Sequence, residues 1–163
     1  MLTVKNGILV NEKADALVNA VNTAGIMDKG IPLQFKVRFP KIFTDYNNAC
    51  KKGKVKIGKM YTTIRGLHAP RYIIHFPVKK HWTESPQLSF IERGLDDLKK
   101  VLIERQITSV ALPPLGFEKG GLNWDIVKPL IIKKLEGIEN LDITLYEPHR
   151  SYYRRGMIQP QVG

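Results

Sequence analysis

The chain has 163 residues, of which 43% are hydrophobic and 25% charged, a composition that suits one globular domain with its own core. No apolar run reaches the roughly eighteen residues that cross a membrane, and the N-terminus lacks the layout of a signal peptide. The single cysteine excludes an internal disulfide and a cysteine-based zinc cluster. We therefore expect a cytoplasmic protein that contacts no membrane and needs no metal or cofactor.

Positive charge is concentrated in the first half of the chain. The formal net charge is +11; residues 1–82 carry 15 basic and 4 acidic side chains, whereas residues 83–163 carry 11 of each. Only Asp45 is acidic between Lys29 and Lys80. A field of this sign attracts nucleic acid, acidic lipid headgroups or phosphorylated ligands. The alternative is that the lysines only make the surface soluble. This alternative stays open because few aromatic residues, which would stack on bases, lie between them.

Apolar runs bounded by turn residues predict seven strands. They lie at residues 2–4, 7–10, 16–21, 58–63, 71–76, 107–112 and 141–146. Several of these runs are apolar on both faces, which is typical of a sheet covered by helices on both sides.

Three helical stretches alternate with these strands. The first covers about residues 30–52 and is divided at Pro40, because the residue before a proline leaves helical geometry. The second begins near Ser85 and Pro86, a cap followed by a first-turn proline, and the third begins after Asn123. This alternation predicts an α/β three-layer sandwich over residues 1–147, followed at 148–163 by a C-terminal tail that we expect to be partly disordered.

Two glycine-rich segments follow predicted strands, where ligands of open α/β sheets bind. Residues 22–30, NTAGIMDKG, and residues 113–124, PPLGFEKGGLNW, each lead into a helix and can direct backbone N–H groups toward a phosphate. Ile31 and Pro32 stand where a Walker A loop requires Lys and Ser or Thr, so that loop type is excluded. Each segment alone also fits an ordinary strand-to-helix turn. Two such loops at the same sheet edge, however, could hold a pyrophosphate from both sides.

Three polar side chains stand near the ends of these strands. Lys79 follows an apolar run, where it would be a nucleophile, an electrostatic stabiliser or an ordinary surface lysine. Asn19 and Asn22 interrupt another apolar run and need hydrogen-bond partners; they either satisfy the loop backbone or hold the hydroxyl groups of a ligand. The four histidines show no metal-ligand spacing.

These segments together resemble the macro domain, an α/β/α sandwich with a central mixed sheet that binds ADP-ribose. The resemblance covers about residues 1–147 and is carried by residues 16–36, 72–82 and 111–131. More narrowly, the sequence is similar to the DarG antitoxins, whose macro domain removes ADP-ribose from thymidine in single-stranded DNA and so reverses the DarT toxin. The resemblance therefore implies a DNA ADP-ribosyl glycohydrolase, with ADP-ribosylated single-stranded DNA and a DarT-like toxin as partners.

The resemblance also implies which residues act. Lys79 corresponds to the catalytic lysine, and Asn22 to the asparagine that contacts the distal ribose. The residues that it places against the substrate are Asn19, Thr23, Gly25, Ile26, Met27, Lys29, Gly30 and Ile31 in the first segment, and Gly116, Phe117, Glu118, Lys119, Gly120, Gly121 and Leu122 in the second.

Several positions depart from the family pattern. Ile8 stands where an Asp or Asn usually reads the adenine, Asp28 where glycine is usual, and Pro32 where alanine is common. Phe117 and Glu118 add bulk and a carboxylate to the second segment, in which a related branch uses an aspartate to assist the lysine; Glu118 is the candidate substitute.

Two other functions stay open beside the hydrolase. The altered contacts favour a binding module for ADP-ribose or a related signalling nucleotide, without catalysis. Alternatively, the domain acts by contact with a toxin, in which case residues 152–155, YYRR, of the tail are a candidate contact element.

Overall fold

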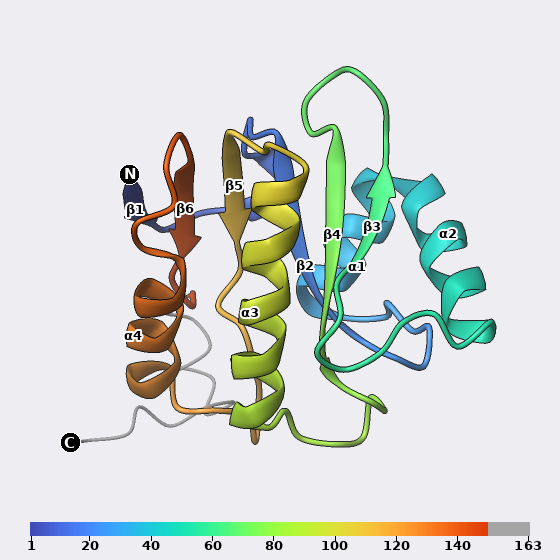
Figure 1. Ribbon diagram of the computed structural model, residues 1–163. Coiled ribbons are helices and arrows are strands. Elements are labelled where there is room, and N and C mark those ends of the chain that lie inside the picture. The colour runs from blue at the N-terminus through green and yellow to red at the C-terminus, as the bar shows by residue number, and fades with distance from the viewer. Residues whose placement is uncertain (150–163) are drawn as a thin grey trace.

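The computed structural model describes residues 1–149, which contain one mixed six-stranded sheet. Its strands are β1 (Leu2–Lys5), β2 (Ala16–Asn22), β3 (Tyr61–Ile64), β4 (Tyr72–Lys79), β5 (Ser109–Leu112) and β6 (Asp142–Tyr146). They lie in the order β1-β6-β5-β2-β4-β3, and every neighbouring pair is parallel except β3 and β4 (Figure 1). The carboxyl ends of β2 and β4 therefore meet at one edge of the sheet.

Helices cover both faces of this sheet, which confirms the three-layer sandwich. They are α1 (Gly30–Arg38), α2 (Pro40–Lys51), α3 (Leu88–Glu104) and α4 (Trp124–Leu135). Figure 1 shows α3 and α4 in front of the sheet and α1 behind it. Neighbouring residues of β2 belong to different cores: Val18 packs in the α3–α4 core and Leu17 in the core with α1 and α2. This alternation explains the strands that are apolar on both faces. Among residues 1–149, no helix is both long enough and apolar enough to cross a membrane.

Two helix boundaries were predicted correctly. Phe39 leaves helical geometry with φ −131°, and Pro40 begins α2 directly after it. Asn123 caps α4, because its side-chain oxygen accepts a hydrogen bond of 2.9 Å from the Asp125 N–H.

Two other predictions are wrong. Residues 7–10 form no strand, because Gly7 turns the chain at φ 135° and a 3-10 helix, η1 (Leu9–Asn11), follows, with Leu9 and Val10 buried in the same core. The second long helix begins at Leu88 and not at Ser85 and Pro86; Gln87 precedes it, without a side-chain cap. Residues 81–84 form a turn instead, in which the Glu84 N–H donates to the carbonyl of His81.

Strand β4 is longer than predicted, and this extension positions Lys79. The strand continues three residues past Phe76 through Pro77 to Lys79, and β3 begins only at Tyr61. The register between β2 and β4 shifts after Val21, so that Asn22 lies opposite Lys79. These two side chains thus begin from adjacent strands at the same sheet edge. The last residues of the predicted tail, 150–163, lie outside the described residues.

Candidate active site

A cleft of about 380 Å³ opens at the carboxyl ends of β2 and β4. One wall is the segment between β2 and the first turn of α1, and the other is residues 113–119, which follow β5. The end of β4 and the turn after it form a third part of the lining, with Val78, Lys79 and Trp82. The two glycine-rich segments therefore face one cavity, as their positions after neighbouring strands predicted.

Lys79 is paired with a carboxylate in this cleft. Its ammonium lies 2.8 Å from Glu118 Oε2 and 3.4 Å from the carbonyl oxygen of Trp82. The residue is only 8% exposed, which is unusual for a lysine and requires such a partner. Lys79 comes from the sheet and Glu118 from the loop after β5, so the ion pair joins two separate walls of the cleft.

Asn22 organises the first loop. Its Oδ1 accepts hydrogen bonds from the backbone N–H groups of residues 24, 25 and 26 at 3.0–3.3 Å, and its Nδ2 donates to the Ile26 carbonyl at 3.1 Å. Asn22 thus satisfies the loop backbone, one of the two roles considered for it. Its side chain also lines the cleft, so a contact with the distal ribose stays a prediction.

Tyr46 of α2 fixes the position of Asn22 through its hydroxyl group. Its hydroxyl lies 2.7 Å from the backbone oxygen of Asn22 and 2.9 Å from its Oδ1. Burial raises the pKa of the Tyr46 phenol well above its ordinary value, so the hydroxyl keeps its proton and remains a donor. The ring of His75 stacks on Tyr46 at 5.2 Å between centroids. The hydrogen bonds of Tyr46 could not be predicted from the sequence.

Asn19 lies beneath the cleft and does not line it. The side chain is fully buried, and its Nδ2 lies 3.9 Å from the sulfur of Met27, while its Oδ1 has no hydrogen-bond partner. Met27 is equally buried. The contact joins β2 to the first loop, and neither residue lines the cleft.

Close backbone packing shapes the second loop. A Cβ at Gly121 would lie 2.4 Å from the carbonyl oxygen of Gly116, and Gly116 itself has a φ of 76°. The Gly121 N–H donates to the Glu118 carbonyl at 2.8 Å, and the Leu122 N–H donates to the Gly116 carbonyl at 2.9 Å. This tight turn directs Glu118 toward Lys79. The glycines are therefore required for the loop conformation, whatever ligand it binds.

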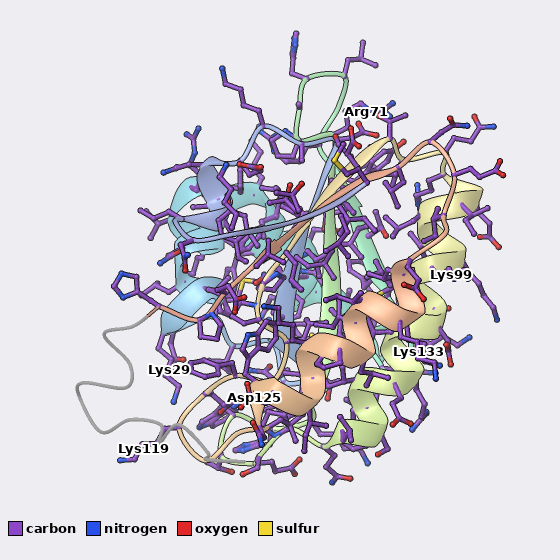
Figure 2. The ribbon with its side chains drawn as sticks, turned by 90° about the vertical axis from the view of Figure 1, so that its left-hand side faces the viewer. Lys29, Arg71, Lys99, Lys119, Asp125 and Lys133 are labelled. Atoms are coloured by element: carbon purple, nitrogen blue, oxygen red, sulfur yellow. The ribbon has the colours of Figure 1, made fainter. Side chains whose placement is uncertain are left out.

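Charges of both signs surround the cleft. Asp28, Lys29 and Lys119 line it together with the Lys79–Glu118 pair. Figure 2 shows Lys29 and Lys119 at the same end of the molecule, one on each loop. Two cations at the mouth favour an anionic ligand, whereas Asp28 opposes it.

Most of the predicted site residues meet in this cleft. Those that line it are Asn22, Ile26, Lys29, Gly30, Ile31, Lys79, Gly116, Phe117, Glu118 and Lys119. Those that do not are Asn19, Thr23, Gly25, Met27, Gly120, Gly121 and Leu122, which support the two loops. Ile8 is 56% exposed and also lies outside the lining.

Sequence reasoning missed Trp82, which lines the cleft beside Lys79. The residue is 42% exposed, and its ring stacks on that of His81 with centroids 3.6 Å apart. The available signal was an aromatic pair directly after two lysines, which is the interleaving typical of nucleic-acid contacts.

Comparisons with known proteins find similar sequences and similar folds. Residues 18–131 match the model of the Macro domain family. The chain is 46% identical over 149 residues to the DNA ADP-ribosyl glycohydrolase of Mycobacterium tuberculosis, covering 91% of this chain and 42% of that protein. It thus spans less than half the length of this curated relative. The macrodomain of Thermus aquaticus DarG superposes with a TM-score of 0.88 at 45% identity, covering 91% of this chain and 99% of that one. Thermosipho africanus DarTG, solved in complex with ADP-ribose, gives 0.84 at 31% identity, covering 90% and 41% respectively.

Proposed function

Because this chain belongs to the macro domain family, we propose that its cleft binds ADP-ribose and that Lys79 releases this group from a modified base of single-stranded DNA. The proposed reaction is hydrolysis of the N-glycosidic bond between the distal ribose and the base. Relatives named DNA ADP-ribosyl glycohydrolase, at 45–46% identity, support this assignment.

The observation that carries the proposal is the Lys79–Glu118 pair. A lysine that is nearly buried at the end of a strand, with a carboxylate 2.8 Å away, has a proton acceptor in place. Both glycine loops border the same cavity, so a pyrophosphate bound between them would hold the distal ribose near Nζ. The Glu118 carboxylate thus supplies the role expected of the missing aspartate.

In the proposed mechanism, Glu118 accepts a proton from the Lys79 ammonium, and the free amine attacks the anomeric carbon of the distal ribose. The glycosidic bond breaks, its electron pair passes to the base nitrogen, and that nitrogen takes a proton from solvent. The adduct is in equilibrium with its ring-opened imine. Water then adds to the anomeric carbon and breaks its bond to Nζ, which regenerates the Lys79 ammonium, and Glu118 returns its proton to solvent. Reductive trapping followed by mass spectrometry detects this adduct; if Lys79 only stabilises charge on the departing base, no adduct forms.

The positive field of residues 29–80 supports a nucleic-acid substrate. This segment contains thirteen basic side chains and one acidic side chain. DNA binding should therefore weaken steeply as the salt concentration rises, because counterions are released on binding. The free cysteine, Cys50, suits a reducing compartment, and we propose a cytoplasmic location.

An oligonucleotide ADP-ribosylated on thymidine tests the proposal. The wild-type protein should release ADP-ribose, and Lys79→Ala should not. Lys99→Ala, an exposed lysine on α3, is the matched control and should behave as wild type.

Two observations favour the second candidate, a binder without catalysis. Asp28 lies in the lining, and Glu118 holds Lys79 in an ion pair. Titration calorimetry with ADP-ribose and cyclic relatives, combined with the release assay, separates the two: heat without release supports the binder.

We also propose a DNA ADP-ribosyl transferase as a protein partner. A relative at 30% identity joins such a transferase to a glycohydrolase in a single fusion protein. Pull-down of a DarT-like transferase with the full chain, and with residues 148–163 removed, tests direct contact and whether the C-terminal residues contribute.

A further inference from the structure

Trp82 has the properties of a stacking platform at the rim of the cleft. It is 42% exposed, yet it lies three residues after the nearly buried Lys79, and its own carbonyl accepts a hydrogen bond from that lysine. An indole left partly in water beside a reactive group has apolar surface available to a ligand.

The platform is held in place on one side. The His81 ring stacks on Trp82 with an interplanar angle of 29°. The His81 Nδ1 in turn lies 2.7 Å from the Thr83 hydroxyl and accepts the Thr83 N–H at 3.2 Å. The indole is therefore pre-oriented, so that less conformational entropy is lost when a flat ring stacks on it.

The proposed reaction indicates whether the DNA base or the adenine of ADP-ribose lies near this indole. If Lys79 engages the anomeric carbon of the distal ribose, the leaving base and its strand lie beyond that carbon, beside the residues that follow Lys79. The adenine lies at the opposite end of ADP-ribose, beyond two phosphates. Trp82 is thus placed to contact the DNA and not the adenine.

A group of exposed lysines lies at and after the end of α2, the helix that contacts the first loop of the cleft. The Thr23 N–H bonds the carbonyls of Lys79 and Lys80, and Asn47 of α2 donates to the carbonyl of Gly25, so that the first loop connects the cleft to the end of α2. Around that end lie Lys51, Lys52, Lys54 and Lys56, all exposed and without an ion pair to any residue in the part of the chain that the structure describes.

Helix capping alone does not account for these lysines. A cation in the last turn of α2, such as Lys51, stabilises the helix dipole. Lys54 and Lys56 lie beyond the helix end, where that effect fades, and no acidic residue lies between Asp45 and Lys80 to neutralise them. Unneutralised charge beside a reactive cleft suits the phosphates of a nucleic-acid strand.

We propose that Trp82 and the lysines at residues 51–56 form the binding track for single-stranded DNA next to the modified nucleotide. Trp82 stacks on a base at the target or beside it, and the lysines contact the phosphates that follow. This inference rests on the proposed function, since it takes the leaving group to be part of a DNA strand.

The test uses a fluorescein-labelled, unmodified oligothymidylate and measures its anisotropy at several salt concentrations. Trp82→Ala should weaken binding about tenfold, whereas Trp82→Phe should retain most of it, because stacking on an aromatic ring is what is lost. Calorimetry should show a smaller loss of ADP-ribose affinity than of DNA affinity for Trp82→Ala. Equal DNA binding by wild type and Trp82→Ala would overturn the platform.

The lysines are tested by their salt dependence. Lys51→Gln/Lys54→Gln should reduce the slope of log K against log salt by about 1.4, the value for two lost phosphate contacts on a single strand. Lys99→Gln/Lys100→Gln makes the same charge change on α3, where Figure 2 shows Lys99, and should leave the slope unchanged. Equal effects of the two pairs would contradict a localised track.

The release assay separates this inference from the proposed function. If the wild type hydrolyses modified DNA but Trp82→Ala and Lys51→Gln/Lys54→Gln leave KM for the oligonucleotide unchanged, the track is wrong and the hydrolase stands. If DNA binding depends on Trp82 but no ADP-ribose is released, the track stands and the hydrolase fails.

Discussion

The Lys79 ammonium and the Glu118 carboxylate lie 2.8 Å apart across the cleft, although 39 positions separate them in the chain. The pair connects the end of β4 with the loop after β5. It places a proton acceptor beside the lysine, and it also places a negative charge where a pyrophosphate would bind. Two experiments on Glu118 separate these effects.

Glu118→Gln keeps the size of the side chain but removes its charge and most of its basicity. We expect release of ADP-ribose to slow by about 100-fold, the range for loss of a positioned acid or base, while ADP-ribose binding stays equal or improves. Single-turnover kinetics and calorimetry measure the two quantities. Unchanged kinetics would show that Glu118 takes no part in the chemistry.

Asn22→Ala should destabilise the first loop as well as the site. The change leaves three backbone N–H groups without their acceptor, and we expect a loss of about 2 kcal/mol in the free energy of unfolding. Urea unfolding measures this loss. Asn47→Ala, which removes a single hydrogen bond to the same loop, is the comparison and should cost less than half as much. Equal costs would mean that Asn22 is not the main organiser.

Gly94 lets α3 approach the sheet closely. A Cβ there would lie 2.3 Å from Cζ of Phe76, so Gly94→Ala should cost about 1–3 kcal/mol through overpacking. The double variant Gly94→Ala/Phe76→Leu should lose less than the sum of the two single changes. Strict additivity in denaturant unfolding would contradict this contact.

His75 makes stability depend on pH. Burial lowers its pKa to about 3, against an ordinary value of 6.5. Between these values the unfolded chain binds a proton that the folded protein does not, so stability decreases as the pH falls below about 6.5. The loss approaches about 1.4 kcal/mol per pH unit. His75→Phe, which keeps a ring against Tyr46, should flatten the dependence of the unfolding free energy between pH 7 and pH 5; the same slope in both proteins would exclude His75 as its source.

Much of the fold could be predicted from local pattern. Pro40 divides the first helix because proline geometry is local, and Asn123 caps α4 for the same reason. Residues 7–10 contain three consecutive apolar side chains, a run that predicts a strand. In the structure the chain turns at Gly7, and Leu9 and Val10 are buried in the same core instead of on opposite faces of a strand. This packing cannot be read from the local sequence pattern.

The site divides in the same way. The positions of Lys79 and the two loops follow from strand ends, so they could be predicted. The Lys79–Glu118 distance, the bonds of Tyr46 to Asn22 and the exposure of Trp82 could not, because each depends on how segments distant in the chain come together. Asn19 is a further case: its polarity left a loop contact and a ligand contact open, and its contact with the sulfur of Met27 depends on how the loop folds over β2.

The most direct test of the account is ADP-ribose release from a thymidine-ADP-ribosylated single-stranded oligonucleotide by wild type and by Lys79→Ala. We predict release by the wild type, none above background by Lys79→Ala, and intact folding of both by circular dichroism. Release by Lys79→Ala at the wild-type rate would contradict the role of this lysine, and no release by either protein would contradict the hydrolase.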